Sequence, residues 1–222
     1  GLISLPAFMA AGVPPHFALG TNKFSSSFGA VTSAYTFIRS GKVHIPLMKF
    51  TVPCTLAGSV IGVFTALRID QKFLRLIILV LIFATAIYTI AKKDFGSEDR
   101  FKELTSRNII QGCLFAFSLG FYDGFFGPGT GSFLIFLFIK VYGFDFTTAA
   151  GNSKVLNFVS NFTSLVMFAI NGKIYYMLGI PIGIAMIAGA RMGSKIAIKN
   201  GAKVIKPIFV TIALALTLKL LF

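Results

Sequence analysis

Charged residues, and acidic residues above all, are scarce in this sequence. Of its 222 residues only 13% are charged and only seven are acidic, whereas 55% are apolar. Soluble domains carry about 25% charged residues, so the composition argues against a soluble protein. Apolar stretches of roughly twenty residues recur, and a helix of that length crosses a hydrocarbon core of about 30 Å. The sequence therefore predicts an all-α polytopic membrane protein.

Residues suited to metal binding and catalysis are equally few. Cys54 and Cys113 lie in apolar segments, without a CxxC spacing or a neighbouring histidine. His16 and His44 fall at segment edges and have no carboxylate nearby in sequence. There is no HExxH motif and no candidate triad. We therefore expect no metal, no cofactor and no enzymatic activity.

Positive charge is in excess, at a formal net charge of +14. The basic residues stand mainly in short segments between apolar runs, as Arg68, Lys72 and Arg75 do. Cations next to a membrane span face anionic lipid, which explains the excess without a nucleic acid. Membrane lipid is the expected partner.

The apolar segments form two series separated by one polar loop. The first series covers residues 2–12, 14–38, 44–66 and 70–91, and the second covers 108–126, 129–142, 145–170, 174–197 and 204–222. The loop 92–107 is the only extended polar stretch and is the predicted linker. We predict a first membrane repeat over 1–91 and a second over 108–222.

An internal repeat at an offset of 131 residues supports this division. Matched pairs include Gly20 and Gly151, Lys23 and Lys154, Ser33 and Ser164, Lys42 and Lys173, Gly58 and Gly189, and Gly62 and Gly193. The repeat predicts two tandem units of about four membrane segments, of which the first lacks its first helix. An even number of segments favours parallel repeats. If 108–143 doubles back as a re-entrant hairpin, the repeats are instead inverted.

The segment GFYDGFFGPGTGSF, residues 120–133, concentrates glycine and proline within an apolar run. Gly124, Gly127, Pro128, Gly129 and Gly131 disfavour a straight helix. A broken helix at membrane depth is tolerated where it meets protein or a water-filled cavity. Free N–H groups at the start of a helix after Gly131 would suit an anion. Alternatively, the glycines permit close helix packing.

Two related tetrapeptides place a lysine inside a predicted membrane helix. They are GTNK (Gly20, Thr21, Asn22, Lys23) and GNSK (Gly151, Asn152, Ser153, Lys154). A lysine there costs about 2.5–3.5 kcal/mol on insertion, which favours a functional role. The two could face one another across a cavity and bind a small oxyanion. Snorkelling of both lysines to an interface is the alternative.

Further polar residues extend this candidate site. Lys154, Asn157, Asn161 and Ser164 are spaced for one helix face, where they line a hydrated path or bond to a neighbouring helix. Asp123 is the only acidic residue within an apolar segment, and it could carry a coupling proton or pair with an intramembrane lysine. The candidate binding residues are Gly20, Thr21, Asn22, Lys23, Gly127, Gly129, Thr130, Gly131, Gly151, Asn152, Ser153, Lys154, Asn157 and Asn161.

These motifs, with AAGNSKVLNFVSNFTSLVMFAINGKI and ALGTNKFSSSFGAVTSAYTFIRSGKV, resemble the TauE/SafE family of sulfite exporter-like permeases. The resemblance implies seven to eight helices from a duplicated four-helix unit in a prokaryotic inner membrane. It implies transport of sulfite, sulfoacetate and related sulfur-containing anions or organic acids. It also implies a site that comprises Gly20, Lys23, Gly127, Gly129, Gly131, Gly151 and Lys154.

The expected function is secondary transport of a small anion, coupled to a proton, another ion or the membrane potential. An anion channel would use the same cationic lining, and a scaffold would not need the lysines. Neither the substrate, the direction of transport nor the oligomeric state follows from the residues.

Overall fold

The computed structural model describes residues 3–91, 99–101 and 103–201, and within these ranges every regular element is a helix. The helices are α1 (Ser4–Ala10), α2 (Pro15–Arg39), α3 (Ile45–Arg68), α4 (Gln71–Ala91), α5 (Ser106–Phe125), α6 (Thr130–Tyr142), α7 (Phe146–Ile170) and α8 (Tyr176–Asn200). They follow the predicted segments closely. The predicted segment 204–222 lies outside the described residues, as does much of the predicted linker 92–107.

Proline, glycine and one capping carboxylate set several helix boundaries. Pro15 opens α2, where a missing N–H costs nothing. Gly129 (φ +86°) and Gly143 (φ +74°) adopt left-handed conformations at the two ends of α6. At the start of α7, the Asp145 side chain accepts a hydrogen bond from Thr148 N at 2.8 Å.

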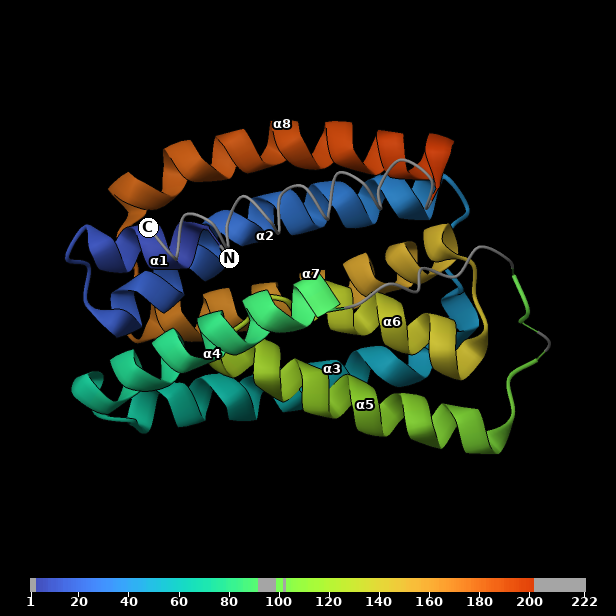
Figure 1. Cartoon of the computed structure of the whole chain (residues 1–222), viewed down its shortest axis with the longest axis horizontal. Coiled ribbons are helices and arrows are strands. Elements are labelled where there is room, and N and C mark those ends of the chain that lie inside the picture. Colours follow the sequence, from blue (N-terminus) through green and yellow to red (C-terminus); the bar gives the residue numbers. More distant parts are fainter. Residues whose placement is uncertain (1–2, 92–98, 102, 202–222) are drawn as a thin grey trace.

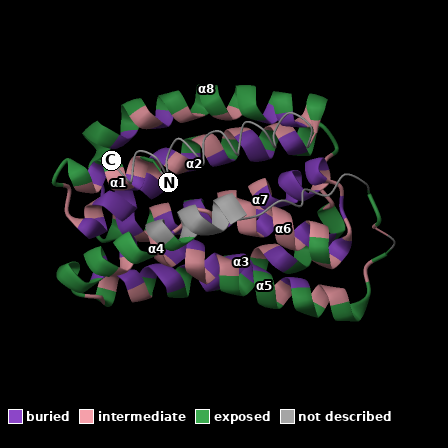
Figure 2. Cartoon of the chain, in the orientation of Figure 1, coloured by how far each residue is buried: buried purple, intermediate pink, exposed green. Residues whose placement is uncertain are grey.

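The helices form an elongated bundle and lie roughly along its long axis (Figure 1). α2 packs on α8 and α7, α7 packs on α3, and α3 packs on α5. Figure 2 shows exposed residues along the outward sides of the helices. Large apolar residues are among the exposed ones, and Leu114, Ile184 and Met192 are each more than 60% exposed. In the described part, α3, α7 and α8 are long and apolar enough to cross a membrane. Apolar outer faces on helices of that length suit lipid contact.

α5 and α6 form the helical hairpin that the sequence left as an alternative. The Tyr142 hydroxyl at the end of α6 donates a hydrogen bond to Asn108 O at the start of α5, at 2.8 Å. The chain therefore reverses at residues 126–129 and returns along α5. One correction concerns α6, which starts at Thr130 and not after Gly131.

Glycines in this region serve two different purposes. Gly120 and Gly124 lie inside α5 and pack against the backbone of Thr55 and Ser59 in α3, while Gly58 of α3 packs against Phe117 O. An added methyl group at any of these three would overlap the facing carbonyl oxygen. Close packing therefore explains the glycines within α5, and the chain break involves those that follow it.

α2 and α7 run antiparallel and contact each other through equivalent residues. Gly20 near the start of α2 packs against Lys173 O just after α7, and Gly151 near the start of α7 packs against Lys42 O just after α2. The members of each pair of glycines and lysines are 131 residues apart. The loop that follows each helix therefore meets the beginning of the other helix.

Two hydrogen bonds repeat this reciprocal arrangement. Tyr175 N donates to Thr21 Oγ1 at 2.9 Å, and His44 N donates to Asn152 Oδ1 at 2.8 Å. Thr21 and Asn152, like His44 and Tyr175, are separated by the same 131 residues. Each helix thus uses a polar side chain to hold the loop of the other.

Candidate functional site

An ion pair buried inside the bundle forms the centre of the candidate site. Lys23 Nζ lies 3.1 Å from Asp123 Oδ1, and the two side chains are 1% and 2% exposed. The same ammonium group also donates to the backbone oxygen of Asp123. A buried charge is strongly destabilising when it has no partner, so each group depends on the other.

Helix packing brings these charges together from opposite halves of the sequence. Lys23 lies on α2, three residues after the closely packed Gly20. Asp123 lies in the last turn of α5, just before the chain reverses. From α7, Asn161 Nδ2 donates to Asp123 Oδ2 at 3.4 Å and to Asn157 O at 2.7 Å. Three helices therefore contribute to one polar cluster.

The chain reversal packs directly against this ion pair. Gly127 has a φ of +100°, and a methyl group there would lie 2.8 Å from Lys23 Nζ and 3.0 Å from Asp123 Oδ1. The Thr130 hydroxyl donates to Gly127 O at 2.7 Å, and the Tyr122 hydroxyl donates to Pro128 O at 2.8 Å. The left-handed conformation favours glycine at position 127, and a larger residue there would displace the Lys23 ammonium group.

The start of α6 offers fewer free amides than the sequence suggests. Thr130 N donates to Gly127 O, while Ser132 N and Phe133 N donate to Gly129 O. Ser153 Oγ of α7 donates to Gly131 O at 3.0 Å. Much of the first turn of α6 is thus already hydrogen-bonded. The charged side chains are therefore a stronger candidate than these amides for binding an anion.

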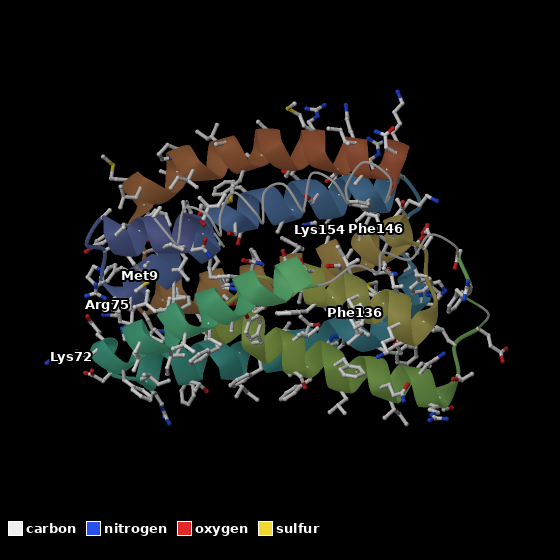
Figure 3. All side chains as sticks on the ribbon, viewed as in Figure 1. Met9, Lys72, Arg75, Phe136, Phe146 and Lys154 are labelled. Carbon is white, nitrogen blue, oxygen red and sulfur yellow. The ribbon has the colours of Figure 1, made fainter. Side chains whose placement is uncertain are left out.

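Lys154 differs from Lys23 in its surroundings. It is half-buried on α7, and among the described residues it forms no ion pair and no hydrogen bond. In Figure 3 it projects within the outline of the bundle, whereas Lys72 and Arg75 lie at one end. The structure therefore pairs one of the two repeat-related lysines and leaves the other without a carboxylate in the described part of the chain.

Several predicted site residues contact the protein's own backbone or side chains. Thr21 and Asn152 hold the loops described above, and Asn22 Oδ1 accepts from Ser4 Oγ at 2.6 Å. Gly20 and Gly151 pack against backbone carbonyls. Their roles in binding stay predictions. The structure brings together Lys23, Asp123, Gly127, Thr130 and Asn161, with Asn157 adjacent.

Sequence reasoning missed Tyr122, whose hydroxyl fixes the chain reversal through Pro128 O. Only its position beside Asp123 could have drawn attention to it. Sequence reasoning named Asp123 as a possible partner of an intramembrane lysine but did not say which lysine. Among the described residues, no group of three or more histidine, cysteine or acidic side chains could hold a metal ion.

A bundle of apolar helices that buries an ion pair beside a chain reversal is consistent with a membrane transport protein. Residues 1–220 match the family model described as sulfite exporter TauE/SafE. The chain belongs to the TauE/SafE family. The family and its curated relatives are named as membrane transporters and not as enzymes.

Several curated relatives match the entire chain. "Probable membrane transporter protein YfcA" of Escherichia coli (strain K12) is 34% identical over 225 residues, and the match covers 82% of that protein. "Probable membrane transporter protein" of Haemophilus influenzae is 34% identical, with 86% covered. "Probable membrane transporter protein ORF9" of a Sinorhizobium species is 35% identical, with 84% covered. No solved structure matches the chain.

Proposed function

We propose that this protein is a secondary transporter that moves small anions across a prokaryotic cytoplasmic membrane, with sulfite or related sulfur-containing or organic anions as substrates. Support comes from the family, described as sulfite exporters, and from relatives named as probable membrane transporters. The observation that carries the proposal is the buried Lys23–Asp123 pair beside the reversal between α5 and α6. Ionisable groups at membrane depth are costly and are typical of transport pathways.

The sign of the charge in this region favours an anion. Lys23 and Asp123 neutralise each other, while Lys154 on α7 adds a positive charge that no described carboxylate balances. Lys154 stands seven residues before Asn161, which places it about 10 Å along the helix at 1.5 Å per residue. The polar face of α7 therefore places a second cation near the ion pair, and this excess of positive charge favours an anion over a cation as the substrate.

We further propose that the two halves of the chain form an inverted repeat, with broken membrane helices at its centre. The antiparallel course of α2 and α7 supports this, as do their reciprocal contacts at a constant offset. The α5–α6 hairpin supplies the reversal that an inverted order requires. In transporters of this kind, substrate sites lie where the repeats meet, and here Lys23 and Asp123 come from different halves.

An anion channel would use the same cationic side chains but would conduct along the electrochemical gradient without coupling. A scaffold would be indifferent to the loss of the lysines. These alternatives make different predictions for flux, so one set of measurements separates them.

The test measures uptake of labelled sulfite, thiosulfate and sulfoacetate into vesicles that contain the purified protein. We expect saturable uptake of at least one anion by the wild type, and a loss of about tenfold or more in Lys23→Gln and Lys154→Gln, since each removes a positive charge from inside the bundle. Lys195→Gln removes an exposed lysine of α8 and serves as the matched control. Wild-type rates for every anion in both folded site variants would refute the cationic site, and linear, uncoupled flux would indicate a channel.

A further inference from the structure

The ammonium group of Lys23 already has a carboxylate bound to it, which restricts how an anion could reach it. Lys23 Nζ contacts both Oδ1 and the backbone oxygen of Asp123. The other carboxylate oxygen, Oδ2, accepts from Asn161. Gly127 lies against Lys23 Nζ and Asp123 Oδ1 on the side of the chain reversal. An anion that binds Lys23 must therefore take the place of the Asp123 carboxylate.

We propose that Asp123 is a proton site, and that each substrate anion enters together with a proton that converts Asp123 to its neutral acid and frees Lys23 for the anion. This inference rests on the proposed transport function and identifies its coupling ion. The protein then works as a proton–anion symporter.

The charge balance of this exchange is complete. Lys23 (ammonium) paired with Asp123 (carboxylate), plus one proton and one monovalent anion, becomes Lys23 (ammonium) paired with the anion, plus Asp123 (carboxylic acid). The proton forms an O–H bond on Asp123 and no covalent bond breaks. The pair and its ligands sum to zero charge before and after, and Lys154 is unchanged by the exchange.

Neutrality is what couples the two ions. If the anion bound while Asp123 stayed ionised, a second negative charge would lie beside one lysine in a buried site. If the proton bound alone, Lys23 would be left without a counter-charge. Both half-reactions leave an uncompensated buried charge, which is strongly unfavourable. Binding of both ions together avoids this cost.

Among the described residues, Lys23 is the charged group in contact with Asp123, and Tyr122 is a further titratable neighbour, whose hydroxyl donates to Pro128 O. α2 contributes Lys23, α7 contributes the uncharged Asn161, and Thr130 of α6 lies next to the carboxylate. α3 presents the backbone of Ser59 to the neighbouring Gly124. Protonation of Asp123 therefore acts most directly on Lys23, because it removes the negative charge that contacts the ammonium group.

The location of the pair also links binding to movement. Lys23 belongs to α2 in the first half of the chain, whereas Asp123 belongs to the α5–α6 hairpin in the second half. When Lys23 exchanges Asp123 for the anion, a charged contact between the two halves is released. Occupancy of the site would therefore alter the contact across which the halves could move.

The experiment uses vesicles that contain the intact protein and labelled sulfite at mildly acidic pH, where hydrogen sulfite predominates. Two quantities are measured for each variant: exchange of internal for external sulfite, and net accumulation driven by an imposed pH gradient. A gradient of about one pH unit allows about tenfold accumulation by a carrier that couples one proton to one anion. Wild type should approach this value, with protein-free vesicles subtracted.

Asp123→Asn mimics the protonated acid permanently. We expect this variant to exchange sulfite. Its net accumulation, divided by its own exchange rate, should fall about tenfold below the wild-type value. Asp70→Asn makes the same change at an exposed capping residue outside the site and should accumulate like the wild type. All variants meet the same sulfite species, so protonation of the substrate itself cancels in the comparison.

Wild-type accumulation by folded Asp123→Asn would overturn the proposal, and so would a complete loss of exchange in that folded variant. If the variant does not fold, the wild type still decides the question. A membrane potential is set with potassium and valinomycin. Wild-type accumulation that does not change with this potential supports neutral cotransport, whereas accumulation driven by the potential refutes it. The absence of any sulfite, thiosulfate or sulfoacetate flux in the wild type would instead refute the proposed function.

Discussion

Separating Lys23 from Asp123 should destabilise the protein far more than removing both charges. In Lys23→Gln the carboxylate of Asp123 remains, 2% exposed and without its counter-charge. In Asp123→Asn the lysine remains, 1% exposed, beside a neutral amide. Breaking a buried pair in this way costs about 3–5 kcal/mol. The double variant Lys23→Gln/Asp123→Asn leaves no charge behind and should lose less than either single variant.

The expected effect is large enough for a melting experiment in detergent. A loss of 1 kcal/mol lowers the melting temperature of a chain of this size by about 2–4 °C, so each single variant should melt roughly 6–20 °C below the wild type. Lys195→Gln, at an exposed position on α8, should change stability by less than about 0.5 kcal/mol.

The wild type, the two single variants and the double variant form a double-mutant cycle. The coupling energy between Lys23 and Asp123 is the decisive quantity. A coupling of several kcal/mol, with the double variant more stable than the single ones, is expected for a direct pair. Additive losses would mean that Lys23 and Asp123 do not interact, and the site described here would then be incorrect.

Two further predictions compare a closely packed glycine with one that has open space around it. Gly127→Ala should displace Lys23 Nζ, which would lie 2.8 Å from the new methyl group at a backbone φ of +100°, and should lower both the melting temperature and sulfite uptake, the latter about tenfold. In Gly131→Ala the new methyl group meets nothing within 4 Å, so the melting temperature should be unchanged. Gly58→Ala should lower the melting temperature because its methyl group would overlap Phe117 O, at a cost of about 1–3 kcal/mol. At the repeat counterpart Gly189 an added methyl group meets nothing within 4 Å, so Gly189→Ala should leave the melting temperature unchanged. Equal effects within either pair would contradict the packing described.

Part of the candidate site was predictable because its signals are local. Lysines inside membrane segments are costly wherever they occur, so Lys23 and Lys154 stand out from the sequence alone. The chain reversal is also a local property, since Gly127, Pro128 and Gly129 disfavour a continuous helix. The same reasoning could not separate Gly124, which packs inside α5, from Gly127, because both are glycines in one short segment.

The pairing of Lys23 with Asp123 was not predictable for the opposite reason. The two residues are 100 positions apart, and the pairing depends on how α5 packs against α3 and on how α2 packs against α7. Polar residues such as Thr21 and Asn152 posed the same difficulty. They resemble binding residues in sequence, yet in the structure their side chains accept hydrogen bonds from loops of the opposite half.

The sequence by itself determined that this is a helical membrane protein, where its helices lie and which lysines are unusual, because hydropathy and helix-breaking residues act over neighbouring positions. The tertiary structure decided that α6 doubles back along α5, that α2 and α7 run antiparallel and that Lys23, not Lys154, is paired with Asp123. Those features arise from contacts between distant segments, and the packing of glycines against facing backbone brings those segments together.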